Sequence, residues 1–271
     1  MKSRTYLQLI FAIALMFAVF CPVLAAQSIG LAPAQVVQTF RPGEPFEIEL
    51  ATVNSGTEPV EMGVEITDFW YDENNEKVFS PPGTSPRSAA NWIQFTPEKF
   101  DVRPGAAQKM KAVVTPPSDA RGGYYAALFV DSKPQLSFRK TSSGSPVYTR
   151  MRVGCLVLLQ AESTEQIKLD VRSATLTPPS ASHALQLRVP LANNSNTHVF
   201  AQPTLAILDP DHKLVAKAQG DMKRLLPGQK DELSIEWAGD LKPGKYSGVL
   251  NVSYGNDGIQ TQVIPFTVGE K

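Results

Sequence analysis

Short runs of alternating apolar and polar residues, separated by Pro, Gly and Asn turns, recur along the chain after its first 26 residues. In one run Phe46, Ile48 and Leu50 alternate with two glutamates, and the run 185–189 alternates in the same way. A period of two puts apolar side chains on one face of a β-strand and polar ones on the other. Many short strands broken by turns predict an all-β sandwich or barrel.

One segment, Lys213–Leu226, allows a second interpretation. Its apolar residues follow helical spacing, but Gly220 interrupts the run, and glycine weakens a helix interior. Leu214, Ala216 and Ala218 also alternate as they would on a strand. We expect a strand here.

Five landmarks occur in the same order in both halves of the chain: an alternating strand ending in asparagine, a second strand, an acidic turn, a Pro-Gly turn, and a glycine-led strand. In the first half these landmarks are Asn54, 64–66, 72–78, 104–105 and 123–130. In the second half they are Asn193, 205–207, 209–215, 227–228 and 244–252. A shared order in divergent sequence indicates one architecture used twice. The sequence therefore predicts two tandem β-domains.

The N-terminus has the layout of a secretory signal peptide. Lys2 and Arg4 precede the apolar run 9–21, and small residues follow at Ala25 and Ala26. The run is too short to cross a membrane, which takes about 20 apolar residues. We expect a signal peptide at 1–26, a first domain at 27–161, a second at 162–271, and no membrane span in the mature chain.

Charge and cysteine content narrow the function classes. Without the signal peptide, 24 basic residues face 26 acidic ones, a net charge near −2. This balance excludes a bulk electrostatic attraction to nucleic acid or to anionic membranes. Cys155 is then the only cysteine and lies in the apolar run 153–159, so we expect a buried side chain and no internal disulfide.

The sequence offers no catalytic or metal-binding pattern. No two of His183, His198 and His212 lie at a metal-ligand spacing in the sequence, and we expect His198, in a polar loop, to be solvated. The acidic segment Asp72–Lys77 lacks the glycine and glutamate that a calcium loop needs at its sixth and twelfth positions, so we expect an exposed turn. We therefore predict a non-enzymatic protein with no catalytic, cofactor or metal site.

The segment 145–159 is the strongest candidate for a binding site. Its early part places Tyr148 and two arginines on one face and apolar residues on the other, and the polar stretch 131–146 before it is expected to be a loop. An unpaired strand edge can accept a strand from another chain, and arginine suits carboxylates because its planar fork makes two parallel contacts. Alternatively, the arginines pair with acidic residues of a neighbouring strand. The predicted partner-binding residues are Val147, Arg150, Met151, Arg152 and Val153.

Several short motifs resemble the periplasmic pilus-assembly chaperones of the PapD type. The motifs are Trp92–Pro97, Phe100–Gly105, Gln108–Lys111, Ala120–Phe129 and Thr149–Arg152, and the resemblance covers about 40–159. It implies two immunoglobulin-like domains. It also implies that the last strand of the first domain adds to the incomplete fold of a secreted pilus subunit, while two basic residues hold the subunit's C-terminal carboxylate.

Arg152 falls where this family pattern has a basic residue on the last strand of the first domain. The second basic residue would fall near Val37, which is apolar, and the donor positions before Arg152 include Ser143 and Ser145. The pattern of apolar donor residues is therefore weak in this chain.

The resemblance implies a non-enzymatic periplasmic chaperone or assembly factor, with an exported, pilus-like surface subunit as its partner. It leaves open whether an outer-membrane assembly protein is a second partner. The alternative is a structural or adhesive envelope protein whose immunoglobulin-like domains bind polysaccharide or another surface protein. Trp70 and Tyr71 are then candidates for an exposed aromatic patch.

Overall fold

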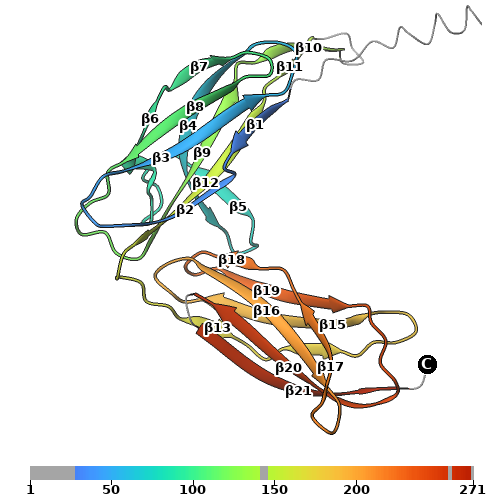
Figure 1. Cartoon of the computed structure of the whole chain (residues 1–271). Coiled ribbons are helices and arrows are strands. Elements are labelled where there is room, and N and C mark those ends of the chain that lie inside the picture. Colours follow the sequence, from blue (N-terminus) through green and yellow to red (C-terminus); the bar gives the residue numbers. More distant parts are fainter. Residues whose placement is uncertain (1–27, 141–145, 256–257, 270–271) are drawn as a thin grey trace, which may run out of the picture.

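Two bodies built from strands follow one another along the chain and meet at an angle (Figure 1). The structure is a computed structural model that describes residues 28–140, 146–255 and 258–269. One short 3-10 helix, η1 (Ala90–Trp92), interrupts the strands of the described residues. The predicted all-β fold of two tandem immunoglobulin-like sandwiches is confirmed. The expected signal peptide lies outside the described residues.

The first sandwich packs two sheets around a core that includes Ile48, Leu50, Leu128 and Val157. The alternation of apolar residues noted above places Ile48 and Leu50 between the sheets. One sheet has the order β1 (Ile29–Ala32), β3 (Phe46–Asn54), β8 (Ala107–Val114), β6 (Ile93–Thr96). The other has the order β2 (Gln35–Phe40), β12 (Arg152–Ala161), β9 (Gly123–Ser132), β4 (Val60–Tyr71), β5 (Lys77–Ser80), with β7 (Lys99–Val102) also paired to β4.

The second sandwich repeats this plan around a core that includes Leu187, Val189, Ile207 and Leu250. One sheet contains β13 (Leu169–Val171), β15 (Leu185–Asn193), β14 (Thr175–Thr177) and β19 (Lys230–Trp237). The other contains β17 (Leu214–Gln219), β16 (Val199–Leu208), β20 (Gly244–Tyr254), β21 (Gly258–Val268) and β18 (Lys223–Leu225). The strand expected at the start of 213–226 is confirmed as β17.

The two acidic turns have the same internal structure. In each, an aspartate Oδ1, that of Asp72 or Asp209, accepts hydrogen bonds from the backbone N–H groups two and four residues later. The third residue after each aspartate, Asn75 or His212, has φ 60°. The aspartate carboxylate therefore serves the turn itself, and the prediction of an exposed turn at Asp72–Lys77 is confirmed.

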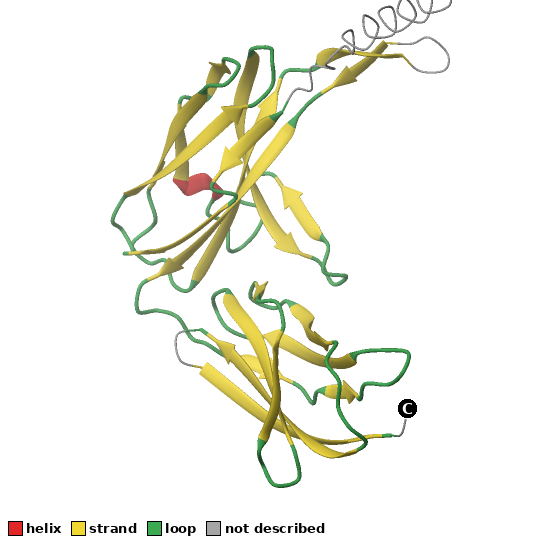
Figure 2. Cartoon of the chain, turned by 45° about the vertical axis from the view of Figure 1, so that its right-hand side comes forward, coloured by secondary structure: helices red, strands yellow, loops and turns green. Residues whose placement is uncertain are grey.

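A projecting hairpin occupies most of the stretch that was expected to be a loop. Asp131 and Ser132 continue β9, and β10 (Gln135–Lys140) then pairs antiparallel with β11 (Pro146–Thr149). We call β10 and β11 the arm, which extends away from the first sandwich (Figure 2). The loop prediction was wrong here because two strands can satisfy each other's backbone groups without the apolar anchors whose absence suggested a loop. Residues 141–145, including Ser143 and Ser145, lie outside the described residues.

The two sandwiches contact each other where β4, β9 and β12 approach β18. Arg224 on β18 donates a hydrogen bond to the Tyr71 hydroxyl at 2.7 Å and another to the side-chain oxygen of Gln35. Leu226 packs into an apolar cluster with side chains from the first sandwich, namely Phe69, Tyr125, Ala127, Phe129 and Leu158. Polar and apolar contacts thus both join the sandwiches.

His198 lies in this junction and is buried, so the expectation of a solvated histidine was wrong. Its ring contacts the rings of Tyr125 and Phe200 edge to face. Burial, and to a lesser extent the nearby charge of Arg224, lower the pKa of His198 to about 4. The polar sequence around His198 was misleading because this loop packs against the first sandwich.

Candidate partner-binding edge

Strand β12 is paired on both sides over only part of its length. On one side it pairs with β9 from Arg152 to Gln160. On the other it pairs in parallel with β2 only from Leu156 to Ala161. Among the described residues, 152–155 therefore have no strand partner on that side, and β11 pairs only with β10. Since β11 leads into β12, one open backbone edge follows 146–155, with a break in the strand at 150–151.

All five predicted partner-binding residues lie along this open edge. Val147 is on β11, Arg150 and Met151 lie at the break, and Arg152 and Val153 begin β12. Met151 and Val153 are half-buried and pack against the core of the first sandwich, while Val147 is half-buried on the arm. The apolar residues thus lie on the face opposite the exposed arginines, as the alternation predicts.

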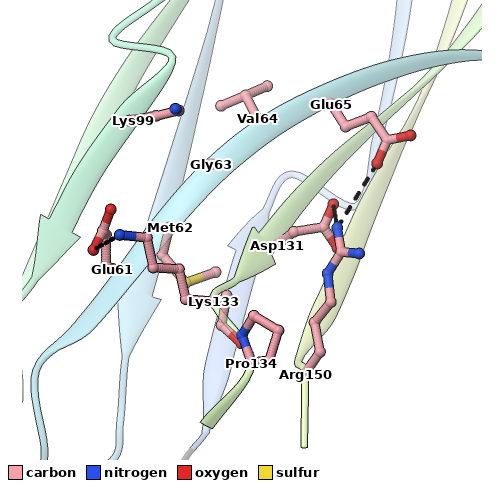
Figure 3. A pocket seen from close by; sticks show the side chains of 11 residues that line it. Glu61, Met62, Gly63, Val64, Glu65, Lys99, Asp131, Lys133, Pro134 and Arg150 are labelled. Carbon is pink, nitrogen blue, oxygen red and sulfur yellow. Dashed lines mark ion pairs between the residues drawn. The ribbon is translucent and has the colours of Figure 1, made fainter.

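Both arginines form ion pairs with acidic residues of neighbouring strands. Figure 3 shows those of Arg150. Arg152 binds Asp131 through two bonds, Nε to Oδ1 at 2.7 Å and Nη2 to Oδ2 at 2.9 Å, and it also contacts the Glu65 carboxylate. Arg150 Nη2 lies 2.9 Å from Asp131 Oδ2 and 3.9 Å from Glu65 Oε2. In this structure both arginines therefore pair with acidic residues of neighbouring strands, which is the alternative given in the sequence analysis.

The strand register explains this cluster. Arg152 lies directly opposite Asp131 on β9, and on β4 Glu65 lies opposite Phe129. The Arg152 guanidinium carbon is 4.4 Å from the centre of the Phe129 ring, a cation–π distance. Gly154, opposite Phe129 on β12, makes room for that ring, because a Cβ at Gly154 would lie 2.9 Å from it. The glycine thus lets the ring lie beneath the arginine.

The charges in the cluster balance: two guanidinium groups face two carboxylates. Burial raises the pKa of Asp131, but hydrogen bonds and charge from Arg152, and then from Arg150, outweigh burial and hold that pKa below its ordinary value. The hydrogen bond to Asp131 raises the pKa of Arg152. Arg152 and Asp131 are therefore both charged at neutral pH.

A pocket of about 290 Å³ adjoins the cluster at the root of the arm (Figure 3). Met62 and Val64 on β4 and Pro134 before β10 contribute its apolar surface. Lys99 and Lys133 line it as well, together with Arg150, Asp131, Glu61 and Glu65. The pocket combines apolar surface with charges of both signs beside the open edge.

The sequence had not singled out Asp131 or Glu65. The available signal for Asp131 was a charged residue directly after the apolar run 124–130. Glu65 resembles any solvent-facing residue of an alternating strand. Only the strand order β12, β9, β4 brings both carboxylates to the arginines.

The other candidate residues from the sequence are Cys155, Val37, Trp70 and Tyr71. Cys155 is buried, which raises the pKa of its thiol to about 11, and the prediction of a buried apolar cysteine is confirmed. Val37 is 48% exposed, and the residue opposite it on β12 is Leu158, which is fully buried. Both residues are apolar, so this position does not supply the second basic residue of the family pattern. Trp70 and Tyr71 are half-buried at the junction of the sandwiches and do not form the exposed patch considered for an adhesive protein.

The described residues contain no group of three or more His, Cys, Asp or Glu side chains placed to hold a metal ion. They also contain no helix long and apolar enough to cross a membrane.

No protein-family model and no curated protein matches this chain. Among solved structures, the class 5 fimbriae chaperone CfaA is similar, at 12% identity over 89% of this chain and 98% of that one, with a TM-score of 0.46. The E. coli chaperone DraB has 15% identity over 90% and 98% of the two chains and a TM-score of 0.43. A chain in the Salmonella enterica complex of SafA pilin with the SafB chaperone has 9% identity over 90% and 97%, and a TM-score of 0.41.

Proposed function

We propose that this protein is a non-enzymatic periplasmic chaperone, with domains at 27–161 and 162–271, that binds an exported, pilus-like subunit along the edge 146–155. The observation that carries this proposal is the open backbone edge of β11 and β12, which leads directly to a pair of arginines. The chaperone-like motifs between 92 and 152 support the same function.

The edge binds its client by adding a strand. Unpaired N–H and C=O groups on 146–155 supply main-chain hydrogen bonds, while side chains on one face of the edge select the client's sequence. Val147, Met151 and Val153 are each half-buried, and the exposed parts of these side chains offer an apolar row to the subunit. Arg150 and Arg152 bind a client carboxylate, for which charge-assisted, two-point contacts are well suited.

Capture of the natural client tests this function. A tagged protein is purified gently from its native envelope extract and examined by native mass spectrometry. We expect a stoichiometric complex with one small secreted β-rich subunit. A variant with Arg150→Ala and Arg152→Ala loses charge-assisted contacts, which costs about 1.5–3 kcal/mol, or roughly 10- to 100-fold in affinity.

The matched control is Arg188→Ala, which removes an exposed, ion-paired arginine from β15 of the second sandwich. This control should retain the client. If the double variant captures as much client as the unmodified protein, the two arginines are not part of the binding site.

A structural or adhesive role is the second candidate, and one observation favours it. The edge strand β21 has no charged residue, and its Ile259 and Val263 are each 65% exposed. Uncharged, exposed edge strands favour association with other surfaces. A bare monomer from the envelope extract, with no subunit lost when the gene is deleted, would favour this role over the chaperone function.

A further inference from the structure

The two acidic partners of the arginine pair are held very differently. The Asp131 side chain is 7% exposed and receives two hydrogen bonds from Arg152 and one close contact from Arg150. The Glu65 side chain is 49% exposed and reaches Arg150 only at 3.9 Å, although it touches Arg152. Asp131 is therefore a fixed part of the site, whereas Glu65 lies on its solvent side.

This difference determines which of the two acidic residues moves away from the arginines first when a ligand approaches. Exposed ion pairs contribute little to stability because water screens them and both side chains lose freedom. Breaking a buried, two-point pair leaves a charge without its partner in a poorly solvated place. Rotation of Glu65 into solvent is thus the less costly way to free the outer side of both arginines.

Charge balance favours a replacement once Glu65 has moved. Arg150, Arg152 and Asp131 alone carry one net positive charge, and one incoming carboxylate restores neutrality. Lys99 lines the adjoining pocket and makes no ion pair among the described residues, so it adds to the attraction. Gly63, opposite Asp131, has no side chain to block the approach, and a Cβ there would meet only the Glu98 carbonyl at 3.9 Å.

We propose that Glu65 is an internal stand-in for a client carboxylate. Client binding exchanges Glu65 for the client's carboxylate at Arg150 and Arg152, while Asp131 stays bound and positions both guanidinium groups. This inference rests on the proposed function, because it concerns the same edge. It makes Glu65 a specificity residue: an uncharged ligand cannot replace it without leaving the arginines undercompensated.

Binding of a defined peptide tests the exchange. The probe is a six-residue acetylated peptide of alternating Val and Thr with a free C-terminal carboxylate, and its C-terminal amide is the uncharged comparison. Dissociation constants are measured by calorimetry with the mature protein and its Glu65→Gln variant. We expect Glu65→Gln to bind the carboxylate peptide about fivefold more tightly, because an exposed ion pair that no longer competes is worth about that factor in affinity. The affinity for the amide peptide should be unchanged.

The control variant is Glu61→Gln, which removes a carboxylate from the opposite side of the same pocket, where it pairs with Lys133. It should bind both peptides as the unmodified protein does. Asp131→Asn should weaken carboxylate binding, because the arginines lose their positioning partner. The NMR signals of the arginine Nε–H groups report this directly: peptide binding should shift the signal of Arg150 while the bond from Arg152 to Asp131 persists.

Equal or weaker binding of the carboxylate peptide by Glu65→Gln, or an equal gain for the amide peptide, would overturn the exchange. The double variant Arg150→Ala, Arg152→Ala separates this failure from failure of the proposed function. If the double variant loses binding while Glu65→Gln matches the unmodified protein, only the exchange is wrong. If the double variant binds the carboxylate peptide normally, the arginine site itself is wrong.

Discussion

Asn54 and Asn193 make the same hydrogen bonds at equivalent places in the two sandwiches. Each is fully buried at the end of an alternating strand, β3 or β15. Each side-chain amide donates to two backbone carbonyls, one four residues later and one next to the Pro-Gly turn, while its Oδ1 accepts the N–H two residues later. The backbone of each also bonds to the Pro-Gly turn. One asparagine therefore joins two loops in each domain.

Replacing either asparagine should destabilise its own domain. Asn54→Ala removes three hydrogen bonds, those to the carbonyls of Glu58 and Val102 and that from the N–H of Gly56, and a buried polar group that loses its partner costs about 1–3 kcal/mol. We expect a loss of at least about 3 kcal/mol in the free energy of unfolding of the first sandwich, measured by urea denaturation. Asn193→Ala should act in the same way on the second. Asn74→Ala, an exposed turn residue, is the control, and a loss as small as that of the control would contradict the prediction.

Gly154 should be intolerant of even one added methyl group. In Gly154→Ala the new Cβ would lie 2.9 Å from the Phe129 ring, so the ring beneath Arg152 has to move. Overpacking of this kind costs about 1–3 kcal/mol. Thermal unfolding measures the loss, and a changed NMR signal of the Arg152 Nε–H group reports the displaced ring. Gly30→Ala is the control because a Cβ there has nothing within 4 Å, and equal stability of the two variants would show that the ring has room.

Stability should fall as the pH drops from about 6.5 to about 4 because of His198. Its pKa is lowered from 6.5 to about 4 by burial, so the unfolded chain takes up a proton at a higher pH than the folded one. Above pH 6.5 the ring is neutral in both the folded and the unfolded chain, so it costs no stability. Below that pH the loss in the free energy of unfolding grows until the folded form also takes up a proton near pH 4. The shift corresponds to roughly 3 kcal/mol at most.

Urea denaturation at pH 7 and at pH 4.5 measures this effect. His198→Phe keeps a ring of similar shape and should lose less stability over that interval than the unmodified protein. His183→Phe, which replaces an exposed histidine, should leave the pH dependence unchanged. An identical pH dependence for His198→Phe and the unmodified protein would rule out His198 as the source.

Arg224 should hold the two sandwiches in one relative orientation. Its guanidinium bonds Tyr71 on β4 and Gln35 on β2, which belong to the first sandwich. Arg224→Met keeps the apolar stem and removes these bonds, so we expect a wider distribution of domain orientations in small-angle X-ray scattering and residual dipolar couplings. Arg188→Met, away from the junction, is the control. An unchanged distribution in Arg224→Met would show that the apolar contacts of Leu226 suffice.

Much of the fold could be predicted because its signals are local. The alternation at Phe46, Ile48 and Leu50 gives β3, and the conflict within 213–226 was resolved correctly as a strand. The order of landmarks from Asn54 and Asn193 onward predicts the repeated domain plan, and the matching hydrogen bonds of these two asparagines agree with it. These patterns depend on residues a few positions apart, which sequence displays directly.

The candidate site could be predicted only in part. The five residues from Val147 to Val153 do lie on one open edge, but the carboxylates that meet the arginines were missed. His198 was expected in solvent, and the arm was expected to be a loop. In each of these cases the deciding partner lies far along the chain or on another strand, as Tyr125 does for His198.

The sequence by itself determined the alternating strands, the acidic and Pro-Gly turns, the twofold use of one domain plan and the alternating faces of the edge strand. Period-two patterning and turn chemistry act within a few residues and need no knowledge of the rest of the chain. Only the tertiary structure decided that Arg152 meets Glu65, 87 residues away, and that a polar histidine loop is buried between domains. Strand order and domain contact decide these points, because burial and charge pairing depend on which distant segments are brought together.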